Sequence, residues 1–262
     1  MLIFQKNHRE TIMSLRQAAA RHPVLAATLC AGVQFLITTL ILKAGMAYAP
    51  AAFGKVKLLA FASTVVLPLA LVHSFGMWRQ VGLHVAETKP SKIFFASMLL
   101  CVLFLSMGVH LMPQRPLGAE VLIQLINAFG EELLFRGVIF VILLALPRWQ
   151  AIMISGVLFG GMHLIHGFMD GNWQHAAWWA LATCLSGMMF AAVRYSTGGL
   201  WLTIVLHMAL NLSKIYSNIE PAAGHATLLV AERLAYGIEF ALVAWVMYRG
   251  SRGAQPPVAA AS

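Results

Sequence analysis

Two adjacent glutamates and an arginine interrupt an otherwise apolar segment near the middle of the chain. The sequence GEELLFRG, residues 130–137, contains Glu131, Glu132 and Arg136. In a helix that crosses a membrane, an ionised side chain near the bilayer centre costs about 2.5 to 3.5 kcal/mol on insertion scales. We therefore expect both carboxylates to face a protein interior or a water-filled cavity, and they are the first candidates for chemistry.

Helical spacing predicts different partners for the two glutamates. Adjacent residues of an α-helix point in different directions, whereas residues four apart share a face. Glu132 lies four residues before Arg136, the favourable order for an ion pair that neutralises a buried charge. Glu131 is then left to face another helix, either as a reactive carboxylate or as a protonated structural group held by hydrogen bonds.

A histidine on the next apolar segment is the second candidate. In FGGMHLIHG, residues 159–167, Phe159 and His163 are four apart, and Gly156, Gly160 and Gly161 remove side-chain bulk. Small residues let a neighbouring helix approach closely, which would bring a carboxylate within reach of His163. The alternative for this histidine is a structural hydrogen bond between helices.

A third segment, LHMALN at residues 206–211, presents His207 and Asn211 four residues apart on one helical face. At about 1.5 Å of rise per residue, these two side chains, Glu131 and His163 all fall in the central zone of a core about 30 Å thick. Three different segments thus place polar groups at a similar depth.

Together these groups meet the requirements for hydrolysis of an amide by water. Removal from bulk water makes a carboxylate such as Glu131 a stronger base, so with neutral His163 it could deprotonate a water molecule. His207 and Asn211 could donate hydrogen bonds to the oxyanion of the tetrahedral intermediate. No serine or cysteine nucleophile is needed.

The composition places these groups in a membrane. The 262 residues are 60% hydrophobic and 10% charged, and the mean hydropathy is +0.78, far more apolar than a soluble protein. We predict an all-α membrane protein, a bundle of about eight transmembrane helices around a polar intramembrane cavity. Segments long enough to span the bilayer lie at about residues 24–47, 57–77, 92–112, 120–146, 149–168, 174–193, 199–217 and 226–248.

The distribution of basic residues predicts the orientation. Most lysines and arginines fall on the side of the termini, so the positive-inside rule predicts cytoplasmic termini. Anionic lipid headgroups account for the net charge of +9, and no nucleic-acid partner is expected. We interpret residues 1–22 as a basic amphipathic cytoplasmic anchor, 23–249 as the transmembrane domain and 250–262 as a disordered tail.

The three motifs together resemble those of a known family. GEELLFRG, FGGMH and LHMALN match EExxxR, FxxxH and HxxxN, the signatures of the CPBP family of CAAX proteases and bacteriocin-processing, Abi-type intramembrane proteases. They occur in the family's order, within a motif core of about residues 92–217. The resemblance implies an intramembrane endopeptidase in which Glu131 and His163 activate water and His207 and Asn211 form the oxyanion hole. The supporting residues that it implies are Glu132, Arg136 and Phe159.

The resemblance also implies partners and a location. We expect a multi-pass protein of a bacterial inner membrane whose substrate is a membrane-associated protein or peptide, with a lipidated substrate as one option. The family's cavity opens toward the cytosol beside a lateral gap for such a substrate.

Two alternatives remain open from the sequence. We expect no cofactor, but in a zinc-dependent version of the protease Glu131, His163 and His207 would be the ligands. The second alternative is a non-catalytic membrane scaffold or immunity protein that uses the same polar cavity for binding.

Overall fold

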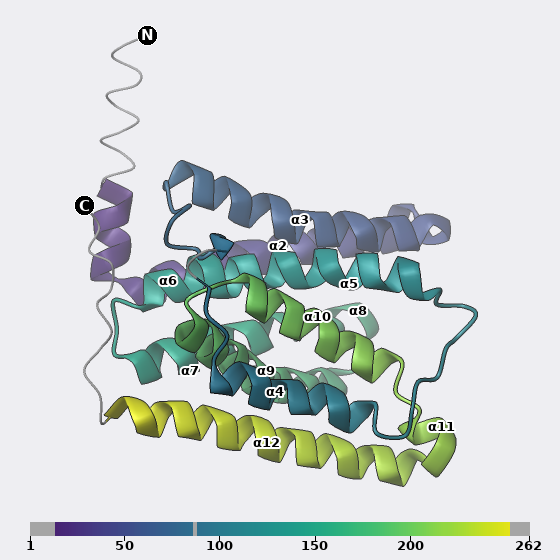
Figure 1. Ribbon diagram of the computed structural model, residues 1–262. Helices are drawn as coiled ribbons and strands as arrows, with labels where there is room; N and C mark the ends of the chain where they lie inside the picture. Colours follow the sequence, from purple (N-terminus) through teal and green to yellow (C-terminus); the bar gives the residue numbers. More distant parts are fainter. Residues whose placement is uncertain (1–13, 86–87, 252–262) are drawn as a thin grey trace.

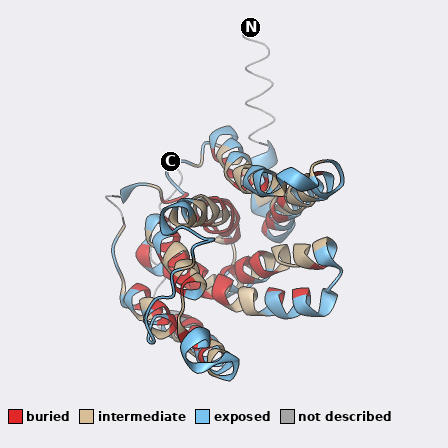
Figure 2. Cartoon of the chain, turned by 90° about the vertical axis from the view of Figure 1, so that its right-hand side faces the viewer, coloured by how far each residue is buried: buried red, intermediate tan, exposed pale blue. Residues whose placement is uncertain are grey.

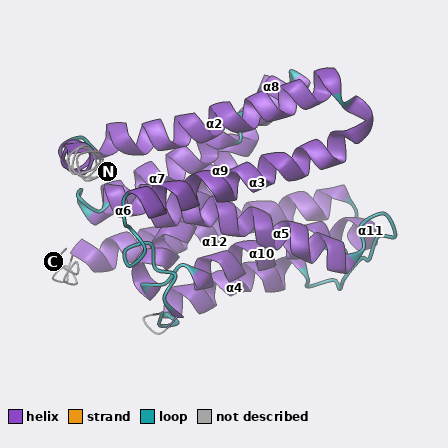
Figure 3. Cartoon of the chain, turned by 90° about the horizontal axis from the view of Figure 1, so that it is seen from above, coloured by secondary structure: helices purple, strands orange, loops and turns teal. Residues whose placement is uncertain are grey.

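The described part of the chain, residues 14–85 and 88–251 of a computed structural model, is helical and contains no strand beyond an isolated bridge between Val109 and Ser217 (Figures 1 and 3). The elements are α2 (Pro23–Tyr48), η1 (Pro50–Ala52), α3 (Phe53–Ser74), α4 (Lys92–Phe104), α5 (Leu117–Glu132), η3 (Leu133–Ile139), α6 (Phe140–Leu143), α7 (Arg148–Met162), α8 (Ile165–Asp170), α9 (Trp173–Thr197), α10 (Trp201–Ile215), α11 (Ile219–Ala223) and α12 (His225–Ser251).

Each predicted hydrophobic segment contains a helix, which confirms the predicted all-α membrane fold. The fourth segment is one continuous rod of α5, η3 and α6, and the fifth is α7 followed by α8. The third is shorter than predicted, because α4 ends at Phe104 and the chain then turns at Gly108, whose φ of +89° favours glycine.

The helices have the length and hydropathy of membrane spans. Among the described residues, four helical segments are long and apolar enough to cross a bilayer: Pro23–Tyr48, Pro50–Ser74, Arg148–Asp170 and Trp173–Thr197. The apolar helices α4 and α10 are shorter. The helices lie roughly along one direction, and α2 begins at the same end of the bundle at which α12 ends (Figure 1).

Glycines allow a close helix contact between α7 and α9. A Cβ atom added to Gly160 would overlap Cys184 and the carbonyl of Ala180, and one added to Gly156 would overlap Met188. The close approach predicted for these glycines is therefore present. The neighbour is α9, which contains no acidic residue, so these glycines do not bring a carboxylate to His163.

The buried faces of the helices meet in the centre of the bundle (Figure 2). The second half of α9 lies deepest: Met189, Ala191, Ala192 and Val193 have no exposed surface. The outward faces carry exposed leucines, valines and aromatic residues, as expected for helices surrounded by lipid. The core thus fixes α9 and the elements around it, which position the polar residues.

The two ends of the chain are described only in part. Of the predicted anchor 1–22, residues 1–13 lie outside the described part, and residues 14–21 are helical. The Arg16 guanidinium donates a hydrogen bond to the Phe75 carbonyl. Of the predicted tail 250–262, Gly250 and Ser251 belong to α12, and residues from 252 onward lie outside the described part.

Candidate active site

The predicted ion pair between Glu132 and Arg136 is present and completely buried. Arg136 Nη1 lies 3.2 Å from Glu132 Oε1, and both side chains are 0% exposed. Arg136 Nη2 donates to the Gly187 carbonyl at 2.8 Å, and the guanidinium lies 4.3 Å from the ring centroid of Phe159. Arg136 therefore connects its own helix, which also contains the two glutamates, with both α7 and α9.

Arg136 lies in a π-helical segment that the sequence did not predict. Residues Leu133–Ile139 follow directly after Glu132, and every residue of this segment is buried. Such segments are rare and occur often at functional sites, because their wider turn changes the direction in which neighbouring side chains point. The segment begins immediately after the two glutamates, so it sets the local geometry of the site.

Both glutamates contact one imidazole. His207 Nδ1 lies 2.8 Å from Glu132 Oε1, and His207 Nε2 lies 3.6 Å from Glu131 Oε2. The prediction that Glu131 and Glu132 have different partners was therefore wrong. An imidazole presents its two nitrogens on different edges, so two long side chains that leave a helix in different directions can still meet at one ring.

The contacts of His207 determine which of its nitrogens can do chemistry. A carboxylate only accepts hydrogen bonds, so Nδ1 carries the proton that is donated to Glu132. The ring stacks on Phe190, with centroids 4.8 Å apart and planes at 21°, and is 4% exposed. Nε2 is left facing Glu131, whose side chain is 22% exposed and is the more accessible of the two glutamates.

His163 is oriented by the backbone of its own helix. Its Nδ1 lies 3.1 Å from the Phe159 carbonyl, which only accepts, so Nδ1 donates and Nε2 of the neutral ring is an acceptor. The Phe159 ring contacts both imidazoles, with centroid distances of 5.2 Å to His163 and 6.0 Å to His207. The contacts of His163 in the described structure are with this phenylalanine, His166 and Trp179, and none joins it to Glu131.

Asn211 lies one helical turn from His207 and contacts two residues that the sequence motifs did not include. Its Nδ2 donates to Gln124 Oε1 at 2.9 Å, and Gln124 Nε2 donates to Glu120 Oε1 at 2.9 Å. The spacing of Glu120, Gln124 and Glu131, four and then seven residues apart, places them on one face of α5. That polar stripe in an apolar helix was the signal that could have identified them.

A second buried acid lies outside this cluster. Glu239 of α12 is 1% exposed and accepts a hydrogen bond from Ser186 Oγ at 2.8 Å. A carboxylate within an apolar helix requires a polar partner, and Ser186 provides it. Ser186 precedes Gly187, whose carbonyl accepts from Arg136, so α12 is anchored next to the backbone that the arginine holds.

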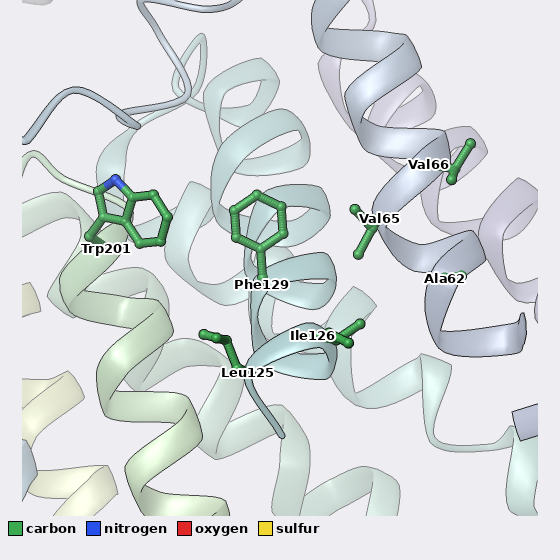
Figure 4. Close-up of a pocket in the computed structure, with 7 residues that line it drawn as sticks. All are labelled: Ala62, Val65, Val66, Leu125, Ile126, Phe129 and Trp201. Carbon is green, nitrogen blue, oxygen red and sulfur yellow. The ribbon is translucent and has the colours of Figure 1, made fainter. Parts of the chain in front are cut away.

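An apolar groove lies on the other side of α5. It has a volume of about 390 Å³ and lies between α3, α5 and α10 (Figure 4). Phe129, which lines it, is two residues from Glu131, and its ring centroid is 5.9 Å from that of Trp201. The other lining residues are Ala62, Val65, Val66, Leu125, Ile126 and Trp201.

The positions of the possible metal ligands can be compared with the zinc alternative. Among residues 14–85 and 88–251, no three His, Cys, Asp or Glu side chains are grouped so that they could hold a metal ion. Glu131 and His207 lie together, but His163 does not join them. The predicted zinc ligands therefore do not form a three-residue site in this conformation.

Comparison with known protein families gives a match over part of the chain. Residues 113–213 match the family described as type II CAAX prenyl endopeptidase Rce1-like, and this stretch contains Glu131, His163, His207 and Asn211. No curated protein and no solved structure matches the chain.

The fold defines a helical membrane protein with a buried centre of acids, histidines and an arginine. Residues 113–213 are similar to the Rce1-like CAAX protease family, and this match supports the resemblance that the three motifs predicted. The match supports a peptide-bond hydrolase, an intramembrane endopeptidase, and the matched family acts on membrane-associated protein substrates.

Proposed function

We propose that the protein cleaves its substrate with a water molecule activated by Glu131, without a metal cofactor. The observation that carries this proposal is the position of the His207 imidazole between the two carboxylates, 2.8 Å from Glu132 and 3.6 Å from Glu131. Glu131 is the partly exposed member of the pair, so it is the one that water and substrate can reach.

In the first step Glu131 takes a proton from water, and the oxygen attacks the carbonyl carbon of the scissile bond. The carbonyl double bond opens to an oxyanion. Collapse of the tetrahedral intermediate breaks the C–N bond, and Glu131 returns the proton to the leaving amine. The products are a new carboxyl terminus and a new amino terminus, so atoms and protons balance.

His207 and Asn211 would stabilise the oxyanion. Because Nδ1 of His207 donates to Glu132, Nε2 can donate only when the ring carries both protons. The carboxylate of Glu132 lies where it stabilises this imidazolium, and Arg136 in turn balances Glu132. Glu131, Glu132, His207 and Arg136 then sum to zero charge, which favours burial of the cluster in an apolar bundle.

His163 would assist the water on the side opposite His207. Its Nδ1 is occupied by the Phe159 carbonyl, so Nε2 can accept a hydrogen bond from the attacking water. The Phe159 ring keeps the two imidazoles apart and packs against both. This role requires the water or the substrate to bridge His163 and Glu131.

We further propose that the substrate carries a lipid chain that lies in the groove between α3, α5 and α10. The lining of this groove is entirely apolar, and Phe129 places it close to Glu131 along α5. An apolar chain held there would leave the adjoining peptide near the reactive carboxylate. The termini would be cytoplasmic in a bacterial inner membrane, in accord with the positive-inside rule.

Replacement of Glu131 tests the proposed chemistry. Glu131→Gln keeps the size of the side chain but removes the base, and should lower cleavage by about 10² to 10⁴-fold while the protein still folds. The assay is mass spectrometry of membrane peptides from cells with native or variant protein, in search of a terminus that only native protein produces. Glu220→Gln, at an exposed glutamate of α11, is the matched control. If cells with Glu131→Gln still produce the peptide terminus found with native protein, the protease mechanism is refuted and a binding protein is favoured.

Metal analysis tests the cofactor part of the proposal. We expect purified active protein to retain its activity after treatment with a chelator and to hold less than one zinc per chain. One tightly bound zinc per chain, with activity lost on chelation and restored by zinc, would contradict the metal-free mechanism.

A further inference from the structure

A polar stripe continues along α5 beyond the residues of the three motifs. Glu120 and Gln124 lie four residues apart, and Gln124 lies seven before Glu131, so all three lie on one face of the helix. The partner across this stripe is α10, whose His207 faces Glu131 and whose Asn211 faces Gln124. The two contacts are about 10 Å apart along α5, at 1.5 Å per residue.

The hydrogen bonds along this stripe have a fixed direction. An ionised Glu120 can only accept, so the Gln124 amide must turn its nitrogen toward it. The oxygen of Gln124 then faces α10, and only the nitrogen of Asn211 can donate to it. The carboxylate at the end of the chain thereby determines which way both amides point.

We propose that Gln124, oriented by Glu120, is a positioning residue that holds the Asn211 amide so that its nitrogen can donate to the scissile carbonyl of the substrate. This inference rests on the proposed function, in which Asn211 donates to the oxyanion. An amide has two N–H groups, so Asn211 can donate one to Gln124 and the other to the reacting oxygen. Without Gln124 the amide can rotate and present its oxygen, which would repel the oxyanion.

The location of these residues supports a functional role. Glu120, Gln124 and Asn211 are each only partly buried. Glu120 lies in the first turn of α5, where the helix dipole favours a negative charge. In a helix surrounded largely by apolar residues, a carboxylate and two amides are costly to place, which favours a functional role for this hydrogen-bonded chain.

The test compares two variants that differ in the acceptor offered to Asn211. Gln124→Met keeps the side-chain size but removes the acceptor, and kcat should fall about tenfold or more while KM stays within about twofold, a smaller loss than removal of a whole oxyanion donor. The exchange variant Glu120→Gln with Gln124→Glu restores a carboxylate acceptor for Asn211 and should recover most of kcat. Gln80→Met, at an exposed glutamine, is the control. The probe is a quenched fluorogenic peptide with a farnesylated CAAX terminus, in proteoliposomes.

Asn211→Ala, alone and combined with Gln124→Met, distinguishes failure of this proposal from failure of the proposed function. In an Asn211→Ala background, Gln124→Met should cause no further loss, because Gln124 acts through Asn211. The positioning role would be overturned if kcat of Gln124→Met equalled that of native protein. It would also be overturned if Gln124→Met lowered kcat by the same factor in the Asn211→Ala background as in native protein. Native kcat in Asn211→Ala itself would instead refute the oxyanion role of Asn211.

A spectroscopic readout keeps the proposal testable without any substrate. The side-chain amide protons of Asn211, observed by NMR in selectively labelled protein in nanodiscs, should shift in Gln124→Met and return in the exchange variant. An Asn211 amide signal that is the same in native protein and Gln124→Met would also overturn the inference.

Discussion

Arg136 allows two glutamates and a histidine to lie together in an apolar bundle. Its guanidinium contacts Glu132, the Gly187 carbonyl and the face of Phe159, and none of its surface is exposed. Planar geometry with several donors suits arginine to such a position better than lysine. The charge that balances Glu132 is thus also the connection between three helices.

Removal of this arginine should destabilise the protein more than removal of the whole pair. Arg136→Met leaves Glu132 buried with one fewer positive partner, and breaking a buried pair in this way costs about 3 to 5 kcal/mol. The double variant Arg136→Met with Glu132→Gln should regain much of that loss in stability but remain inactive. Thermal unfolding in detergent measures both, with Arg249→Met at the exposed end of α12 as control. Equal destabilisation of the single and double variants would contradict this account.

The motif residues could be identified from the sequence, but not all of their contacts. Spacing along one helix predicted the ion pair of Glu132 with Arg136, because both partners belong to the same turn. The contacts of His207 with Glu131 and of Asn211 with Gln124 join different helices. Such contacts depend on the relative height and rotation of α5 and α10, which no single-helix pattern determines.

The helices themselves were predictable to different degrees. The long apolar segments were recognised because a span needs about 20 apolar residues. The π-helical turn at Leu133–Ile139 was not, because its residues would also suit an ordinary α-helix. The early end of α4 was missed because residues 105–112 remain apolar although Gly108 turns the chain. Hydropathy thus indicates where a segment can enter the membrane and not how its backbone is wound.

The contact between α7 and α9 gives a prediction with a neighbouring control. Gly160→Ala should destabilise the protein by about 1 to 3 kcal/mol, because its Cβ would overlap Cys184 and the backbone of Ala180. Gly161→Ala, one residue later in the same helix, has nothing within 4 Å of the added Cβ and should be neutral or slightly stabilising. Unfolding of both variants in the same detergent is the measurement. A Gly161→Ala loss as large as that of Gly160→Ala would contradict the role of this contact, because helix propensity favours alanine at both positions.

Over the whole molecule, the polar cluster around Glu131 and the apolar groove lie on different faces of α5. A substrate that uses both must therefore pass around this helix or lie along it. The peptide part would meet Glu131 from the α10 side, and the lipid part would contact Phe129 and α3. This arrangement predicts that the two parts of the substrate can be perturbed separately.

Filling the groove tests that separation. Ala62→Trp should raise KM for a farnesylated peptide severalfold, because the indole would occupy space that is about 390 Å³ in the native protein. The kcat/KM for the same peptide without the lipid should change little. Leu59→Trp, at an exposed position of α3 outside the groove, is the control. Equal effects on both peptides would contradict binding of the lipid in this groove.

The shortness of α4 and α10 has a consequence for the surrounding lipid. With 13 and 15 residues, they are about 20 and 22 Å long at 1.5 Å per residue, less than a hydrocarbon core of about 30 Å. The exposed side of α4, with Phe95, Leu99 and Val102, therefore meets lipid that must thin locally to match it. Headgroups and water then lie closer to His207 and Asn211 than the average membrane thickness implies. Cleavage should accordingly be faster in vesicles of 14-carbon than of 22-carbon phosphatidylcholine, so that membrane thickness itself sets the rate at which this protease works.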